Sequence, residues 1–184
     1  MKKRLFIAIP LSEEVLNQLE AYNYSLNLKN LRRMPKQNLH ITVYFLGDVE
    51  EAEISDLIDR LNCALIGVKA FSLIFEEITF APPNQQPRMI WAQFKNNKNY
   101  DKLSRITYNA IHKFAGVKED PEEKTIIPHI TLARFRYLFN ADNTKLEQPK
   151  ISNLEVKSCL LMESELNSNG SIYSTVATFF FDII

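Results

Sequence analysis

The same pair of polar residues occurs twice in this sequence. A histidine stands two positions before a threonine at His40 and Thr42, and again at His129 and Thr131. Side chains alternate across a β-strand, so each pair would place an imidazole and a hydroxyl side by side on one face. If the two strands line one site, two groups that titrate near neutral pH and two hydroxyl donors converge. Hydrolysis of a phosphodiester needs such groups: a base for water, an acid for the leaving oxygen, and donors for the phosphate oxygens.

The surroundings of the histidines favour acid–base chemistry over metal chemistry. The sequence has no His-x-His and no His-Glu-x-x-His pattern, so we expect neither a metal nor another cofactor. A single histidine is better interpreted as a core or rim residue, but two in matching contexts favour a shared role. The third histidine, His112, lies inside a helical pattern and is predicted to be a surface residue.

Two neighbouring positions extend the predicted site. Tyr44 follows Thr42 by two positions, so strict alternation puts it on the same face, where it could stack on a base or remain an aromatic residue at the rim. Basic residues stand near both motifs, and for each cluster alone a solvated loop is the simpler interpretation. They are Lys29, Arg32, Arg33 and Lys36 before the first motif, and Arg134 and Arg136 after the second.

The composition and charge of the chain limit the kinds of partner that it can bind. The 184 residues are 46% hydrophobic, which is ordinary for a globular protein. Twenty-two basic and 22 acidic side chains give a formal charge of zero, which argues against many phosphate contacts along a nucleic acid but allows recognition of one end. The sequence shows no secretory signal and no apolar run near the ~20 residues of a membrane span, so a cytoplasmic protein is expected. Cys63 and Cys159 lie in apolar segments and are predicted to be reduced core residues.

Hydrophobic periodicity and turn residues predict an α+β fold with mostly antiparallel sheets. The segment from Pro10 to Asn38 is predicted to be a helix followed by a loop. The predicted strands are 4–9, 39–46, 71–80, 89–94, 126–138, 154–163 and 172–181, and the predicted helices begin at Ser12 and cover 51–65 and 99–114. The two motif strands start alike and lie about half the chain apart, which suggests an internal duplication.

With these elements in place, the sequence resembles a known family. His-Ile-Thr-Val-Tyr-Phe-Leu-Gly at 40–47 and Pro-His-Ile-Thr-Leu-Ala-Arg at 128–134 resemble the two signatures of the 2H phosphoesterase superfamily. Within it the sequence resembles the RNA 2',3'-cyclic phosphodiesterases, also called LigT-like proteins or 2'-5' RNA ligases. The resemblance covers nearly the whole chain: the first strand, the segment Pro87–Trp91 and a closing hairpin with Gly170 and Tyr173 also match.

The resemblance implies a fold, a reaction and a partner. The fold is one bilobal domain over 1–184, with two mostly antiparallel sheets related by pseudo-twofold symmetry around a central groove and helices on the outside. The reaction is metal-independent hydrolysis of RNA 2',3'-cyclic phosphate ends to 2'-phosphomonoesters, with minor 2'-5' ligase activity. The partner is an RNA 3' terminus, with tRNA fragments as one source, and the protein is expected to be a monomer that binds no membrane.

The resemblance also implies residue roles. His40 would be the general acid and His129 the base, although the symmetry of the motifs leaves the two interchangeable on residue grounds. Thr42 and Thr131 would hold phosphate oxygens. Arg134 matches a basic residue of the family and would pair with phosphate, yet strict alternation puts it on the face opposite His129 unless a bulge turns it inward.

Two other functions fit the same residues. A relative that hydrolyses small cyclic phosphates, such as ADP-ribose cyclic phosphate, would use the same four residues. A non-catalytic RNA-binding module could keep the fold, but it would have no need of both intact His-Thr pairs.

Overall fold

The computed structural model describes residues 1–114, 126–142, 144–167 and 170–183. Along the chain, the helices and strands within these ranges are β1 (Lys2–Ile9), α1 (Glu13–Ser25), β2 (Leu31–Arg33), η1 (Lys36–Asn38), β3 (Ile41–Glu50), η2 (Glu51–Glu53), α2 (Ile54–Leu65), β4 (Phe71–Leu73), β5 (Phe75–Ala81), β6 (Met89–Phe94), α3 (Lys98–Ile111), β7 (His129–Phe135), β8 (Leu154–Val156), β9 (Ser158–Asn167) and β10 (Gly170–Phe180).

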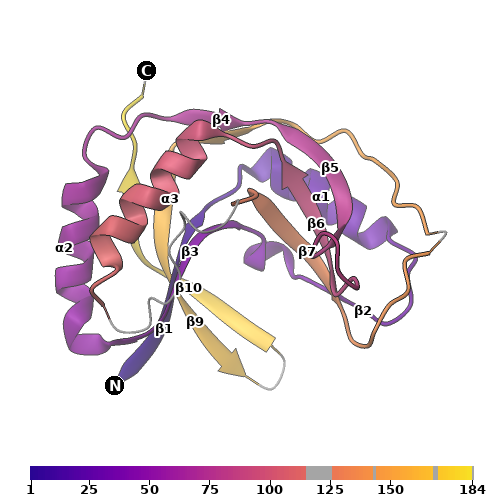
Figure 1. Cartoon of the computed structure of the whole chain (residues 1–184), viewed down its shortest axis with the longest axis horizontal. Coiled ribbons are helices and arrows are strands. Elements are labelled where there is room, and N and C mark those ends of the chain that lie inside the picture. The colour runs from indigo at the N-terminus through magenta and orange to yellow at the C-terminus, as the bar shows by residue number, and fades with distance from the viewer. Residues whose placement is uncertain (115–125, 143, 168–169, 184) are drawn as a thin grey trace.

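The strands form one large and one small sheet. The large sheet has the order β10-β9-β1-β3-β7-β6-β5, with β2 added to β7, and β4 pairs with β8 in a two-stranded sheet. Every pairing between these strands is antiparallel. The predicted α+β class with mostly antiparallel strands in two sheets is confirmed. The helices flank the large sheet: α2 and α3 lie together beside β3 and β10, and α1 lies beside β7 (Figure 1).

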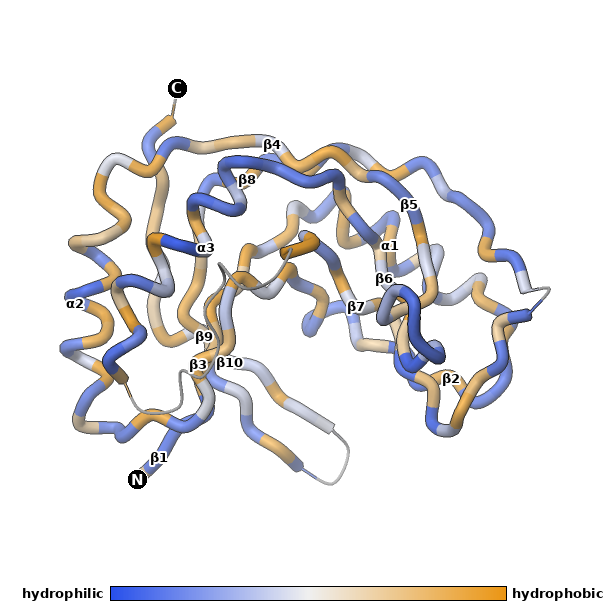
Figure 2. The backbone as a smooth tube through the Cα atoms, in the orientation of Figure 1, coloured by the Kyte–Doolittle hydropathy of each residue, from blue (hydrophilic) through white to orange (hydrophobic). Residues whose placement is uncertain are grey.

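Local sequence explains the helices. Ser12 caps α1, because its hydroxyl accepts a hydrogen bond from the Val15 amide at 3.3 Å, and two glutamates occupy the first turn, where negative charge is favourable. In α2 the buried residues are Leu57, Leu61 and Leu65, four positions apart, so one stripe of the helix faces the core. Hydrophobic and hydrophilic residues alternate along this helix in Figure 2.

The central strand β1 is buried on both faces. Leu5, Ile7 and Ile9 belong to the main core beneath the helices. On the other face Phe6 and Ala8 form a second, smaller apolar cluster with Met162, and Leu160 and Tyr173 pack against it. The strand therefore carries apolar residues toward both sides of the large sheet.

The structure differs from the sequence prediction in several places. The predicted loop before the first motif contains β2 and η1. The predicted strand 71–80 divides into β4 and β5, and the predicted strand 154–163 divides into β8 and β9. The predicted strand 126–138 is shorter and forms β7. Cys63 is exposed on α2 rather than in the core, while Cys159 is buried as expected. The charged segment predicted as a loop at 118–124 lies outside the described residues.

Candidate active site

The two motifs meet where the two halves of the large sheet join. Among the described residues β3 and β7 share one Cα pair, Ile41 with Ile130, and both isoleucines are fully buried toward the core. The residues on either side of each isoleucine point to the opposite face of the sheet. Antiparallel pairing then sets His40 across from Thr131 and Thr42 across from His129. We call these four residues the tetrad, and the side of the sheet that carries them the tetrad face.

In the first motif both ring nitrogens of His40 have partners. Nδ1 lies 2.8 Å from the Asn38 carbonyl oxygen, and Nε2 lies 3.1 Å from the Thr42 hydroxyl. A carbonyl oxygen only accepts, so Nδ1 carries the hydrogen and Nε2 is the position that gains or loses a proton. Asn38 is itself held in place, because its side chain donates to the Ser171 carbonyl on β10 at 2.9 Å.

The second motif repeats the contact between Nδ1 and a backbone carbonyl. Nδ1 of His129 lies 2.7 Å from the carbonyl oxygen of Ile127, again two residues earlier in the chain. The imidazole stacks on the Trp91 indole of β6, with centroids 3.6 Å apart and planes 20° apart. His129 therefore also keeps Nε2 for proton transfer, and its ring plane is set by a neighbouring strand.

Aromatic side chains hold the first imidazole as well. His40 lies 5.0 Å from the Phe6 ring and 5.4 Å from the Tyr173 ring, which meets it edge to face. The family resemblance includes Trp91 and Tyr173, but the residue patterns assign neither of them to the site. The register of β6 with β7 explains the position of Trp91, because Trp91 pairs with Thr131.

Burial lowers the pKa of both imidazoles below the usual 6.5. The hydrogen bonds to the Asn38 and Ile127 carbonyls act in the opposite direction, because they favour the protonated ring. Repulsion between positive charges adds to the lowering: His129 lowers the pKa of His40, and Arg134 lowers the pKa of His129. The charge on His129 therefore affects the titration of His40.

A bulge in β3 moves Tyr44 away from the tetrad. The register with β1 pairs Ala8 with Thr42 but Ile7 with Tyr44, so one extra residue is inserted between them. Tyr44 is only 9% exposed and its ring lies 5.8 Å from that of Tyr108 on α3. The prediction that Tyr44 shares the face of His40 was wrong, because the inserted residue reverses the alternation of side chains.

A similar bulge in β7 places Arg134 on the tetrad face. The register with β6 pairs Trp91 with Thr131 but Ile90 with Ala133, so Leu132 is the extra residue. Leu132 and Ala133 are both fully buried, and Arg134 returns to the tetrad face five positions after His129. The sequence allowed this position only if a bulge were present, and the bulge is present.

A buried side chain from a flanking helix holds each bulge. Tyr100 of α3 donates its phenol hydrogen to the Thr42 carbonyl at 2.7 Å, next to the bulge in β3. Asn23 of α1 donates its amide to the carbonyl of Leu132 at 3.0 Å. Both residues are buried, so the two backbone carbonyls receive a hydrogen bond that water would otherwise provide.

The basic cluster before the first motif divides between structural and site positions. Arg33 donates to the carbonyls of Asn23 and Leu26, and Lys36 forms an ion pair with Glu13 at 2.7 Å. Arg32 pairs directly with Arg134 across β2 and β7. Cross-strand partners point the same way, so Arg32 is the one residue of this cluster shown by the register to be on the side of Arg134.

Several other expectations concern residues outside the tetrad. His112 is exposed at the end of α3, as predicted. Within the described parts of the chain no group of three His, Cys, Asp or Glu side chains could hold a metal ion. No helix in those same parts is both long and apolar enough to cross a membrane.

Comparisons with known proteins find relatives along nearly the whole chain. The family model of LigT like phosphoesterases matches residues 9–91, a range that includes the first motif. The RNA 2',3'-cyclic phosphodiesterase of Methanocaldococcus jannaschii is 28% identical over 178 residues, which cover 94% of this chain and 98% of the relative. That of Thermotoga maritima is 27% identical over 94% of this chain and 92% of its own length. Over the matched range the chain resembles the LigT like phosphoesterases.

Solved structures share the fold of this chain. A Thermus thermophilus protein superposes with a TM-score of 0.80 at 24% identity, covering 97% of both chains. Escherichia coli LigT in its apo form gives 0.80 at 19% identity over 98% of both. The same LigT complexed with 3'-AMP gives 0.79. At these identities the likeness concerns the fold of the chain.

Proposed function

We propose that this protein is a LigT-like phosphoesterase that hydrolyses RNA 2',3'-cyclic phosphate ends to 2'-phosphomonoesters, with protein side chains alone as acid and base. The observation that carries the proposal is the Ile41–Ile130 pair, because it brings both His-Thr pairs onto one face of the sheet. The printed names of the M. jannaschii and T. maritima relatives, RNA 2',3'-cyclic phosphodiesterase, support this substrate class.

The proposed reaction assigns one task to each member of the tetrad. His129 takes a proton from water at Nε2, and the water oxygen forms a bond to phosphorus. The bond from phosphorus to O3' breaks, and His40 gives its Nε2 proton to O3', so that the product is a 3'-hydroxyl and a 2'-phosphate. The Thr42 and Thr131 hydroxyls donate to the non-bridging oxygens, where negative charge builds up in the transition state.

Arg134 is proposed to bind the same phosphate. Its guanidinium donates to the Met89 sulfur at 3.0 Å, and among the described residues it forms no ion pair. A thioether is a weak acceptor, so most of the donor capacity of this cation is left for a ligand. A phosphate matches the fork of the guanidinium, because it can accept two parallel hydrogen bonds from it.

An RNA with a 2',3'-cyclic phosphate end tests the proposal. We expect the wild-type protein to release a 2'-phosphate product in the presence of a metal chelator. His40→Ala and His129→Ala should each slow hydrolysis by about 100- to 10,000-fold, the usual contribution of a general acid or base. His112→Ala is the matched control, because His112 is the histidine outside the tetrad, and it should retain full activity.

Two results would contradict this assignment. Unchanged hydrolysis in either tetrad variant would remove that histidine from the reaction, and a 3'-phosphate product would exchange the leaving oxygen and so the roles of acid and base. Substrate size separates the proposal from hydrolysis of small cyclic phosphates. We expect the oligonucleotide to be turned over faster than ADP-ribose cyclic phosphate, and 2'-5' ligation to be the minor reaction.

A further inference from the structure

The two histidines of the tetrad differ in the aromatic rings that contact them. The His129 imidazole lies face to face on the Trp91 indole, with centroids 3.6 Å apart and planes 20° apart. The rings next to His40 are farther away and not parallel to it: Phe6 lies at 5.0 Å and 36°, and Tyr173 at 5.4 Å and 82°. The stack on the indole is therefore an asymmetry that the two identical motifs do not contain.

The strand register fixes the indole beside His129. Trp91 pairs with Thr131 of β7 on one side and with Thr79 of β5 on the other, so β6 is flanked by strands on both edges here. The side chain is half-buried, and among the described residues its buried Nε1 has no hydrogen-bond acceptor. In the described part of the chain, Trp91 thus contacts His129 through its ring face and not through its N–H.

The face of an indole attracts a positive charge, and tryptophan does so more strongly than tyrosine or phenylalanine. In the proposed reaction His129 becomes positively charged as it takes the proton from water, while His40 loses its positive charge to O3'. An indole stacked on His129 therefore stabilises the charge that forms during the reaction. The same ring stacked on His40 would instead oppose the loss of the proton from the acid.

We infer that Trp91 is a positioning residue that commits His129 to the role of base. This inference rests on the proposed function and adds to it the feature that distinguishes the two histidines. The indole holds the plane of the imidazole and stabilises its protonated form when the water proton reaches Nε2 and the water oxygen bonds to phosphorus. His40, which lacks this parallel stack in the described structure, gives its proton to the leaving O3'.

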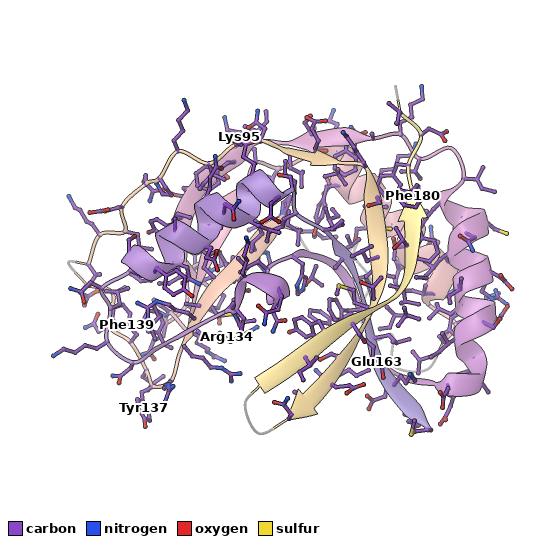
Figure 3. The ribbon with its side chains drawn as sticks, turned by 180° about the vertical axis from the view of Figure 1, so that it is seen from behind. Lys95, Arg134, Tyr137, Phe139, Glu163 and Phe180 are labelled. Carbon is purple, nitrogen blue, oxygen red and sulfur yellow. The ribbon has the colours of Figure 1, made fainter. Side chains whose placement is uncertain are left out.

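Charged groups around His129 on the tetrad side of the sheet come from four strands. They are Arg32 of β2, His40 of β3, Arg134 of β7, and Glu76 and Glu77 of β5. Burial and the positive charge of Arg134 both lower the pKa of His129. Gln93 separates the glutamates from His129, because it pairs with His129 on one side and Glu77 on the other. Glu163 lies in the other half of the molecule from Arg134 (Figure 3). A substitution of the indole leaves all these charges in place.

Two substitutions of the indole test the inference. Trp91→Leu removes the aromatic face, and Trp91→Phe keeps a smaller one. On an RNA with a 2',3'-cyclic phosphate end, Trp91→Leu should lower kcat by about 2- to 30-fold with KM nearly unchanged. Trp91→Phe should lie between the leucine variant and the wild type.

Titration of the His129 ring by NMR gives a measurement that does not depend on activity. The imidazolium loses its favourable contact in Trp91→Leu, so the pKa of His129 should fall further below its wild-type value. The ring signal of His112, outside the tetrad, serves as the internal reference. If Trp91→Leu does not fold, Trp91→Phe carries the same test with a smaller fall in the pKa of His129.

Phe80→Leu is the matched control, because it replaces an aromatic ring on the strand next to Trp91. Phe80 pairs with Ile90, so it lies on the opposite face of the sheet, where it packs against Phe135 and Phe139. The control should change neither kcat nor the titration of His129.

Several outcomes would overturn the inference. A rise in the pKa of His129 toward 6.5 in Trp91→Leu would mean that the indole only excludes water. Equal behaviour of Trp91→Phe and Trp91→Leu would mean that it only fills space, and a higher KM in place of a lower kcat would make it a contact for the RNA. Failure of the wild-type protein to hydrolyse the RNA would instead reject the proposed function, while the titration still reports the effect of the indole.

Discussion

His40 and His129 make the same hydrogen bond to the backbone and have pKa values shifted in the same direction. Each uses Nδ1 to donate to the carbonyl two residues earlier, and each is buried enough to lower its pKa below 6.5. One proton shared by the pair is the form that can act as acid and base at once. In the free protein this form is most abundant below pH 6.5.

The pH dependence of catalysis follows from that distribution. We expect kcat/KM for a cyclic-phosphate RNA to be bell-shaped with its maximum below pH 6.5, because this constant reports the free enzyme. Bound phosphate is negative and favours the imidazolium, so the maximum of kcat should lie at higher pH. Initial rates over a pH series at several RNA concentrations would measure both. A kcat/KM maximum above about pH 7.5 would contradict the lowered pKa values.

Residue spacing shows how far the sequence alone could predict this site. Alternation over two positions was enough to place each threonine on the face of its histidine. Over four or five positions it failed, because the inserted residues in β3 and β7 reverse the phase, and Phe45 rather than Tyr44 faces the tetrad. Nothing in the local composition marks either insertion, since the residues around them are apolar and β-branched like any buried strand.

At the scale of elements, the helices cover the sheet and also hold the bulges in β3 and β7. Tyr100 from α3 and Asn23 from α1 each donate to a backbone carbonyl at a bulge, and so each helix fixes the phase of the strand it covers. Neither contact follows from the sequence, because both residues lie far along the chain from the strand they bind.

Removal of one hydroxyl tests this role. Tyr100→Phe leaves the buried Thr42 carbonyl without its donor and should lower the free energy of unfolding by about 1–3 kcal/mol. We expect kcat to fall with KM nearly unchanged, since the contact orients Thr42 rather than the RNA. Urea unfolding and steady-state rates would measure the two effects. Tyr108→Phe removes a hydroxyl from the same helix and should change neither the free energy of unfolding nor kcat. If both variants behave alike, the hydrogen bond to the Thr42 carbonyl has no special role.

At the scale of the whole molecule, the two buried imidazoles make the free energy of unfolding depend on pH. An unfolded chain protonates its histidines near pH 6.5, whereas the folded chain resists protonation until lower pH. Stability is therefore unaffected by this pair above pH 6.5, falls as the pH drops from 6.5 toward the folded-state values, and levels off below them. This window lies above the usual pKa of carboxylates, about 4.

A comparison of unfolding at about pH 7.5 and about pH 5.5 measures this effect, since the two values lie on either side of the ordinary histidine pKa. The wild-type protein should lose stability toward the lower pH, as read from the urea midpoint at each pH. The double variant His40→Asn, His129→Asn carries neither buried imidazole and should lose less. If the variant and the wild type lose stability equally, other groups control the acid response.

The fold as a whole was easier to predict than the way in which its halves join. Strand and helix patterns were sufficient for the α+β class and for most elements, since each depends on residues close in sequence. The single Ile41–Ile130 pair that unites the two halves depends on residues far apart in the chain. The similar bulges in β3 and β7 add a second likeness between the halves, in keeping with the duplication suggested by the motifs.

The bulges also affect how sequences of this kind should be compared. In a strand without a bulge the fourth residue after the histidine would lie on the tetrad face, whereas here the fifth residue does so in both halves. A chain without the inserted residue would therefore present its aromatic or basic side chain one position earlier. An alignment that allows a gap of one residue after each threonine would match positions on the same face of the sheet, while a gapless alignment would pair a residue of the tetrad face with a core residue.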